Sequence, residues 1–301
     1  MRVTNNQYYI QMLRNIQRPA QDMLDIQNQL SSGKRINSYS DDPGGSAIVE
    51  KYKSTRSESE QFIRNISDGV VWMNQTESAL SSLEDNLIQA KALAVQGANA
   101  SNSRSERQDI GNEVNQILES ILSLANSNFR GKYLFAGVYT NARPYIETRD
   151  NDGSINGFGV ANDLSGTIDR AINEGVNVQI NVPGDDVFNL TDGPLASIMA
   201  LRDALLSNDV EGIQNSIDAV DTALEGSLTA RTELGARMAR METIQFFQES
   251  QGISYTSLIS EIEDADYAEL SVRLATSEAG YRAAISTSAR IVQTSLVDLL
   301  T

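Results

Sequence analysis

Carboxylates dominate the side chains of this sequence that could do chemistry, and two clusters of them stand out. The chain has neither histidine nor cysteine, so Ser–His–Asp and Cys–His nucleophiles, thiolate chemistry and histidine-bound zinc are excluded. Carboxylate chemistry, an activated lysine or a bound cofactor remain. The two clusters are Asp41-Asp42-Pro43-Gly44-Gly45 near one end, and Glu261, Glu263, Asp264 and Asp266 near the other.

Neither cluster has the pattern of a catalytic or ligand site. The first lacks the Gly-Lys-Ser/Thr of a phosphate-binding loop, and its negative charge would repel phosphate. Asp42 followed by Pro43 instead predicts the N-cap and first residue of a helix. The second cluster lacks the ligand spacing of a calcium loop. We interpret it as a solvated helix start, where the helix dipole favours negative charge.

The remaining candidates favour structural roles. Asp152-Gly153 predicts a hairpin turn because both residues tolerate positive φ. Lys34 and Lys91 have no neighbouring signature of an activating base, and Trp72 is expected in the core. We therefore predict that the chain is not an enzyme and binds neither cofactor nor metal. A ligand-binding module in residues 145–195 stays open as an alternative without a motif.

Apolar spacing predicts that long helices carry these residues. Near the N-terminus the apolar positions step by three and four, as in a coiled-coil seam: Met12, Ile16, Pro19, Met23, Ile26 and Leu30. Pro19 is expected to kink or split that helix. A last helix, from about Asp266, has a seam of small residues in its middle. On periodicity alone, two alternatives stay open: the two ends pair as a self-contained bundle, or they become ordered only on binding a partner.

Capping signals place the other helices. One is predicted from Pro43 to near Gly97, and Ser103 with Glu106 forms a capping box for the next. A short helix is expected over residues 195–206, and a longer one from about Asn208. Between these helical halves, residues 145–195 are rich in glycine and acidic residues, and 177–182 alternate as in a half-buried strand.

The predicted fold is therefore mainly α: an elongated long-helix bundle or coiled-coil rod, formed by the N- and C-terminal halves, with a small β-rich inserted domain. Residues 1–42 and 261–301 are expected to form terminal assembly helices. Residues 43–144 and 196–260 are expected to form the helical rod, and residues 145–195 the insert.

Charge and hydropathy bound the partners. The formal net charge of −16 disfavours binding to nucleic acid and to anionic membranes. No apolar run is long enough to span a bilayer, and the N-terminus lacks the apolar region of a secretory signal. Taken alone, these features predict a cytoplasmic protein.

Two segments carry a resemblance that changes this prediction. Residues 30–38, Leu-Ser-Ser-Gly-Lys-Arg-Ile-Asn-Ser, with Asp41-Asp42-Pro43, resemble the N-terminal signature of the bacterial flagellin family. Residues 260–268, Ser-Glu-Ile-Glu-Asp-Ala-Asp-Tyr-Ala, resemble its C-terminal signature. The opening residues 1–7 and the Tyr-Leu-Phe-Ala-Gly of 133–137 resemble members located between hook and filament. Residues 290–300 lack the flagellin pattern, although a short flagellin stays the alternative.

The resemblance implies an extracellular structural part of the bacterial flagellum, exported by the flagellar type III apparatus without a cleaved signal. The implied partners are hook-associated protein 1, flagellin, further copies of the chain and a flagellar export chaperone, with no small-molecule substrate. The residues expected to make assembly contacts lie on the terminal seams and in the first signature: Met12, Ile16, Met23, Ile26, Leu30, Arg35, Ile36, Asn37, Leu270, Leu274, Tyr281, Ile285, Ile291 and Leu296.

Overall fold

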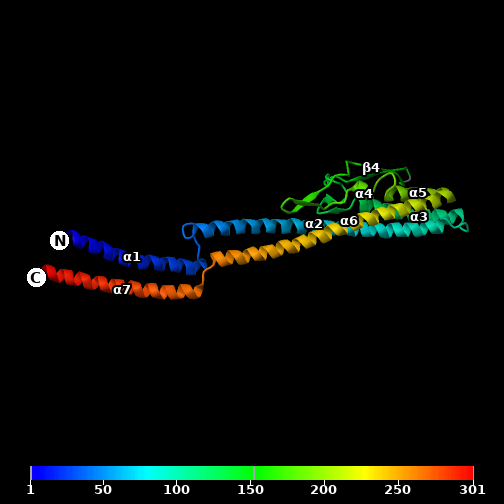
Figure 1. The fold of residues 1–301 in the computed structure, drawn as a ribbon. Coiled ribbons are helices and arrows are strands. Elements are labelled where there is room, and N and C mark those ends of the chain that lie inside the picture. Colours follow the sequence, from blue (N-terminus) through cyan, green and yellow to red (C-terminus); the bar gives the residue numbers. More distant parts are fainter. Residues whose placement is uncertain (1, 152, 301) are drawn as a thin grey trace. The chain divides into compact units, whose positions relative to one another are not determined.

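The fold is built from long helices, as the apolar spacing predicted. The computed structural model describes residues 2–151 and 153–300, with side chains at 7, 9–151 and 153–290. The chain divides into two compact units. The first combines Met1–Glu58 with Ser250–Thr301, and the second is Ser59–Glu249. Figure 1 shows the elements of both units along the chain.

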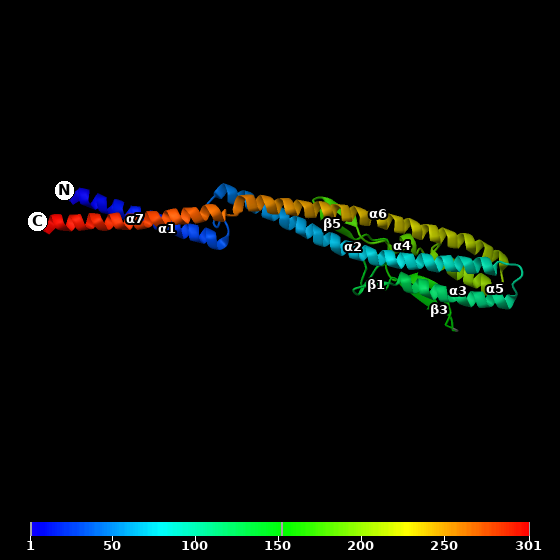
Figure 2. The ribbon, with the colours of Figure 1, turned by 90° about the horizontal axis from the view of Figure 1, so that it is seen from below.

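The first unit pairs the two ends of the chain. Helix α1 (Arg2–Ser32) and helix α7 (Tyr267–Leu300) pack along each other, and Figures 1 and 2 both show them side by side. The unit also contains the start of α2 (Pro43–Gly97) and the end of α6 (Val210–Glu263). The predicted pairing of N- and C-terminal helices is confirmed.

Pro19 does not interrupt α1, which corrects the expected split. The helix is continuous from Arg2 to Ser32 with Pro19 inside it. Proline fixes φ near a helical value, so its cost is one missing backbone hydrogen bond and crowding with the carbonyl four residues earlier. Pro19 is half-buried in this unit.

Four helices form the core of the second unit: α2, α6, α3 (Arg104–Ala125) and α5 (Pro194–Ser207). The predicted capping box opens α3, because Ser103 accepts from the Glu106 amide and Glu106 accepts from the Ser103 amide. The predicted end of α2 at Gly97 is also confirmed. Arg231 of α6 pairs with Glu77 and Glu84 of α2, which fixes the register of these two helices.

Short antiparallel hairpins cover part of this core. They pair β1 (Asn128–Phe129) with β2 (Lys132–Tyr133), β3 (Tyr145–Arg149) with β4 (Ile155–Val160), and β5 (Asp169–Asn173) with β6 (Val176–Gln179), before the short helix α4 (Gly184–Val187). The small β-rich region is confirmed, although the first hairpin precedes residue 145. The turn expected at Asp152 lies outside the described residues.

The strand predicted over residues 177–182 is only partly present, because β6 ends at Gln179. Beyond it, Asn181 is buried with its amide oxygen accepting from the Ile168 amide, 2.7 Å away, and its amide nitrogen donating to the Gly166 carbonyl. Apolar and polar residues do alternate over 177–182. Beyond Gln179, however, the hydrogen bonds of the Asn181 side chain take the place of backbone pairing with a second strand.

Candidate assembly site

The two signature segments meet at one place in the first unit, where α1 connects to α2 and α6 connects to α7. The Arg35 amide donates to the Glu263 carbonyl (2.7 Å), and the Ala265 amide donates to the Gly33 carbonyl (3.0 Å). These bonds form an isolated antiparallel bridge between Lys34 and Asp264. We call residues 33–42 with 262–267 the linker junction.

Gly33 ends α1 in a conformation that favours glycine. Its φ is +73°, and a Cβ atom there would lie 2.8 Å from the Tyr267 hydroxyl. Its carbonyl accepts the bridge hydrogen bond from Ala265. The glycine of the first signature therefore lets the chain leave α1 and approach the start of α7 closely.

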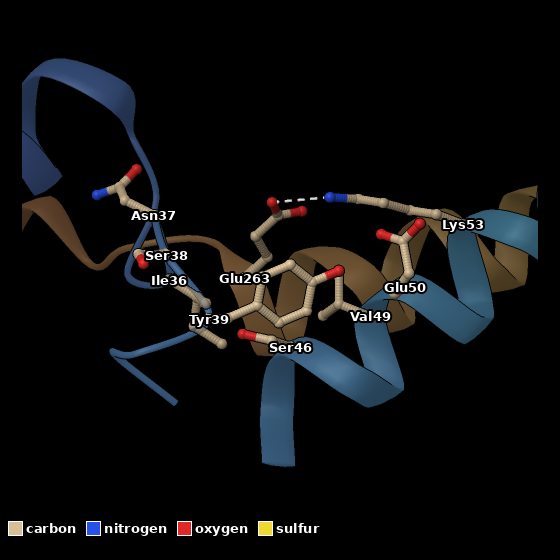
Figure 3. Close-up of a pocket in the computed structure, with 9 residues that line it drawn as sticks. All are labelled: Ile36, Asn37, Ser38, Tyr39, Ser46, Val49, Glu50, Lys53 and Glu263. Atoms are coloured by element: carbon tan, nitrogen blue, oxygen red, sulfur yellow. Dashed lines mark hydrogen bonds and ion pairs between the residues drawn. The ribbon is translucent and has the colours of Figure 1, made fainter. Parts of the chain in front are cut away.

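Glu263 is the charged centre of the linker junction. Its side chain is 10% exposed, and its carboxylate lies 2.9 Å from both the Lys34 and the Lys53 ammonium groups. Burial opposes its ionisation, but the hydrogen bonds and charges of Lys53 and Lys34 outweigh burial and lower the pKa of Glu263. Figure 3 shows the Lys53–Glu263 contact between α2 and α6.

This arrangement corrects the prediction that the acidic cluster at 261–266 is a solvated helix start. Only part of it has that role: Asp266 accepts from the Ala268 and Glu269 amides, 2.8 and 3.2 Å away, and caps α7. Glu263 instead lies at the end of α6 as a buried ion-pair partner of two lysines. Those partners could not be predicted from the sequence, since Lys53 is distant in the chain.

The first carboxylate cluster has capping roles. Asp41 accepts from the amides of Asn37 (3.0 Å) and Ser38 (2.8 Å). Asp42 accepts from the Gly45 amide (2.9 Å), which confirms it as the N-cap of α2. That hydrogen bond is the main reason that the pKa of Asp42 is lowered, with a further contribution from Arg35. Both carboxylates therefore shape the linker.

A small pocket of about 150 Å³ opens beside the linker junction (Figure 3). Ile36 and Val49 are its buried apolar residues, and Glu263 lines another side. The Ser46 hydroxyl also lines it, is buried, and has no hydrogen-bond partner among the described residues. Tyr39 lies at the pocket and is 66% exposed.

The structure brings most predicted assembly residues into this unit, in two environments. Ile26, Ile36 and Leu270 are buried, whereas Arg35, Asn37 and Ile285 are exposed. The other described residues of the predicted set are half-buried: Met12, Ile16, Met23, Leu30, Leu274 and Tyr281. The side chains of Ile291 and Leu296 lie outside the described residues.

Sequence reasoning missed a second apolar stripe on α1. Tyr9, Ile10, Leu13 and Leu24 are 56, 44, 38 and 60% exposed. Ile10, Leu13 and Leu24 fall on helical spacing through Gln17 and Ala20. Their steps of three and four could have revealed the stripe beside the stronger seam at Met12–Leu30.

The sequence profile of the bacterial flagellin N-terminal helical region matches residues 3–140. The profile of the bacterial flagellin C-terminal helical region matches residues 217–300. The first match includes residues 33–42 of the linker junction, and the second includes residues 262–267. The chain belongs to the bacterial flagellin family. The flagellin-family chain is thus related to structural components of the flagellum.

Three known proteins place it within this family. A flagellin of Listeria innocua is 28% identical over 89% of this chain and 88% of its own. Flagellar hook-associated protein 3 of Escherichia coli K12 is 22% identical, with 89% of each chain covered. The flagellar junction protein FlgL of Legionella pneumophila shares the fold, with a TM-score of 0.57, 16% identity, and coverage of 73% of this chain and 100% of its own.

The described helices also bear on membrane and metal sites. Within residues 2–151 and 153–300, no helix has the length and hydropathy required to cross a bilayer. The same part of the chain contains no group of three or more acidic side chains placed to hold a metal ion.

Proposed function

We propose that this flagellin-family protein is a structural adaptor that joins the flagellar hook to the flagellin filament and assembles through its terminal helices. The observation that carries the proposal is the pair of apolar stripes on α1. One stripe packs against α7, while the other stays exposed in the isolated chain.

The exposed stripe supports assembly because it is too apolar for a solvated face. Burying a leucine, isoleucine or similar side chain stabilises a contact by about 1.5–3 kcal/mol. Contiguous exposed apolar surface on a soluble chain marks an interaction site. A partner helix that covers Ile10, Leu13 and Leu24 would gain that stabilisation and leave the α1–α7 seam undisturbed.

The linker junction supports the same function from the other end of α1. Ion pairs of Glu263 and the backbone bridge hold the paired ends in one unit. Asp41, Asp42 and Asp266 accept backbone amides there, and Glu263 pairs with lysines, which favours a structural role over catalysis. We expect hook-associated protein 1 and flagellin as neighbours, further copies of the chain beside it, and an export chaperone before secretion.

A short flagellin is the second candidate, favoured by the 28% identity to the Listeria innocua flagellin. The two functions predict different behaviour of the purified full-length protein. A flagellin polymerises by itself into long filaments that electron microscopy resolves, whereas a junction adaptor yields monomers or short assemblies. Long filaments of this protein alone would favour flagellin and overturn the adaptor proposal.

The adaptor function is tested in cells that lack the gene. We expect such cells to carry hooks without filaments and to release flagellin into the medium. The intact gene should restore attached filaments, while a variant without residues 267–301 should be produced without restoring them. Attached filaments in the absence of the gene would overturn the proposal.

A further inference from the structure

A second and larger pocket lies within the second unit, between α6 and the segment that leads into α4. Its volume is about 390 Å³. Its apolar or small lining residues are Val182, Pro183, Gly226 and Ala230, and its polar ones are Asp186, Thr229, Glu233 and Arg237. Neither the linker junction nor the terminal helices contribute to it.

The pocket has an excess of negative charge. Arg237 pairs with Glu233 at 3.1 Å and donates to the Asn181 carbonyl at 3.3 Å. Asp186 keeps no ion pair of its own among the described residues, and Asp185 adds a further carboxylate nearby. Asp186 is exposed, and partial loss of solvent, then the charges of Glu233 and Asp185, raise its pKa despite the charge of Arg237. An additional cation in the pocket would stabilise this carboxylate.

Gly226 leaves room in the pocket at a cost to α6. Glycine inside a helix is less favourable than alanine by about 1 kcal/mol. A Cβ atom at Gly226 would meet nothing within 4 Å in its own chain, so packing within the chain does not require this glycine.

The same unit presents a cationic turn that is matched in charge to this pocket. The β1–β2 hairpin carries Arg130 in its turn and Lys132 at the start of β2, both exposed, with φ of +52° at Arg130 and +79° at Gly131. Within the described part of the chain neither cation forms an ion pair. Arg130 lies 5.0 Å from the Phe129 ring centroid, and Phe129 packs edge-on against Trp72 of α2, which anchors the turn.

The turn and the pocket lie at the same position along the length of the paired helices α2 and α6. Arg231 contacts Glu77, and Gly69 faces Met241, so Trp72 lies opposite the Arg237 region of α6. In the view of Figure 2, α6 and β1 lie on opposite sides of α2. The turn does not line the pocket of its own chain. A second copy beside the first could bring the two together.

We infer that the β1–β2 turn of one copy inserts Arg130 and Lys132 into the Asp186–Glu233 pocket of the next copy. This inference rests on the proposed assembly function and names one of its lateral contacts. Such a contact joins two different surfaces, so repeating it at a constant level generates a ring or a helical row. Local charge complementarity fixes the register even though both copies are acidic overall.

Disulfide trapping in assembled flagella tests the contact, because the natural chain has no cysteine. Cells would produce the full chain with Lys132→Cys and Thr229→Cys, and their sheared flagella would be oxidised and run without reductant. We expect a ladder of cross-linked dimers and larger species. Each single variant should give none, and adding Gly226→Leu to the double variant should remove the ladder, because leucine fills the pocket while favouring the helix.

The matched control replaces Lys132→Cys by Arg104→Cys, since Arg104 is another exposed cation of the same unit. Two results would overturn this contact while filaments stay attached in all strains: a ladder from the control pair, or no ladder from any pair. Either result would leave the adaptor function intact. Absence of the unmodified protein from flagella would instead overturn the adaptor function and the contact with it.

Discussion

At the residue scale, Glu263 joins the two linkers in two ways. Its carbonyl accepts the backbone bridge from Arg35, and its carboxylate pairs with Lys34 and Lys53. The signature containing Glu263 was evident in the sequence, and so were the capping role of Asp42 and a helix start near Asp266. The lysine partners were not, because ion pairs between distant residues depend on how α2 and α6 pack.

Glu263→Gln should destabilise the first unit by about 1.5–3 kcal/mol, the usual contribution of a hydrogen bond to a charged group. Hydrogen exchange of the Arg35 and Ala265 amides would report it as faster opening. Glu249→Gln, at an exposed carboxylate of α6, is the matched control and should change neither amide. Unchanged protection in Glu263→Gln would contradict the assigned role.

The same carboxylate predicts a pH dependence. Because the folded chain lowers the pKa of Glu263 from its usual value of 4.5, its stabilising contribution is present above the unfolded pKa. That contribution is lost as the pH falls through the folded pKa. Protection of the Arg35 and Ala265 amides should therefore fall in acid for the wild type, and fall less for Glu263→Gln. Equal pH profiles would count against this account.

Gly33→Ala should destabilise the linker junction by about 1–2 kcal/mol, because φ of +73° is unfavourable for residues with a Cβ atom. Gly280→Ala is the matched control. Gly280 lies inside α7 with nothing within 4 Å of the added methyl group, so alanine there should stabilise the helix. Thermal unfolding of both variants should move in opposite directions, and a parallel shift would refute the explanation.

At the element scale, helix identity followed closely from spacing and caps. The Ser103–Glu106 box and the Met12–Leu30 seam predicted helices that the structure contains. Two expectations failed and one feature was missed. The helix α1 is continuous through Pro19, and the pattern of β6 ends before the buried Asn181. The exposed stripe at Ile10–Leu24 was missed beside a stronger seam.

The two stripes of α1 predict different mutant phenotypes. Ile26 is 2% exposed, so Ile26→Ala should destabilise the first unit by about 2–4 kcal/mol and increase proteolysis of the chain ends. Leu24 is 60% exposed, so Leu24→Ser should leave the monomer unchanged while preventing attachment of filaments. Limited proteolysis and counts of attached filaments separate the two effects. The same phenotype in both variants would argue against two distinct faces.

At the scale of the whole molecule, the family resemblance predicted the location of the protein, which composition could not. Absence of a signal and of membrane spans predicted a cytoplasmic protein, whereas the flagellin profiles place the chain among extracellular flagellar components. Composition describes solubility but carries no information about the route of export. The three-part division predicted from the sequence stays a prediction, since the structure separates two units, at residues 58–59 and 249–250.

The central claim is that the protein occupies the boundary between hook and filament, and immunogold electron microscopy of intact flagella tests it most directly. Antibody raised against residues 145–195 would label wild-type cells, with cells lacking the gene as the control for specificity. The adaptor account predicts gold confined to the hook end of each filament. Gold distributed along the entire filament would contradict it and identify the protein as the filament subunit.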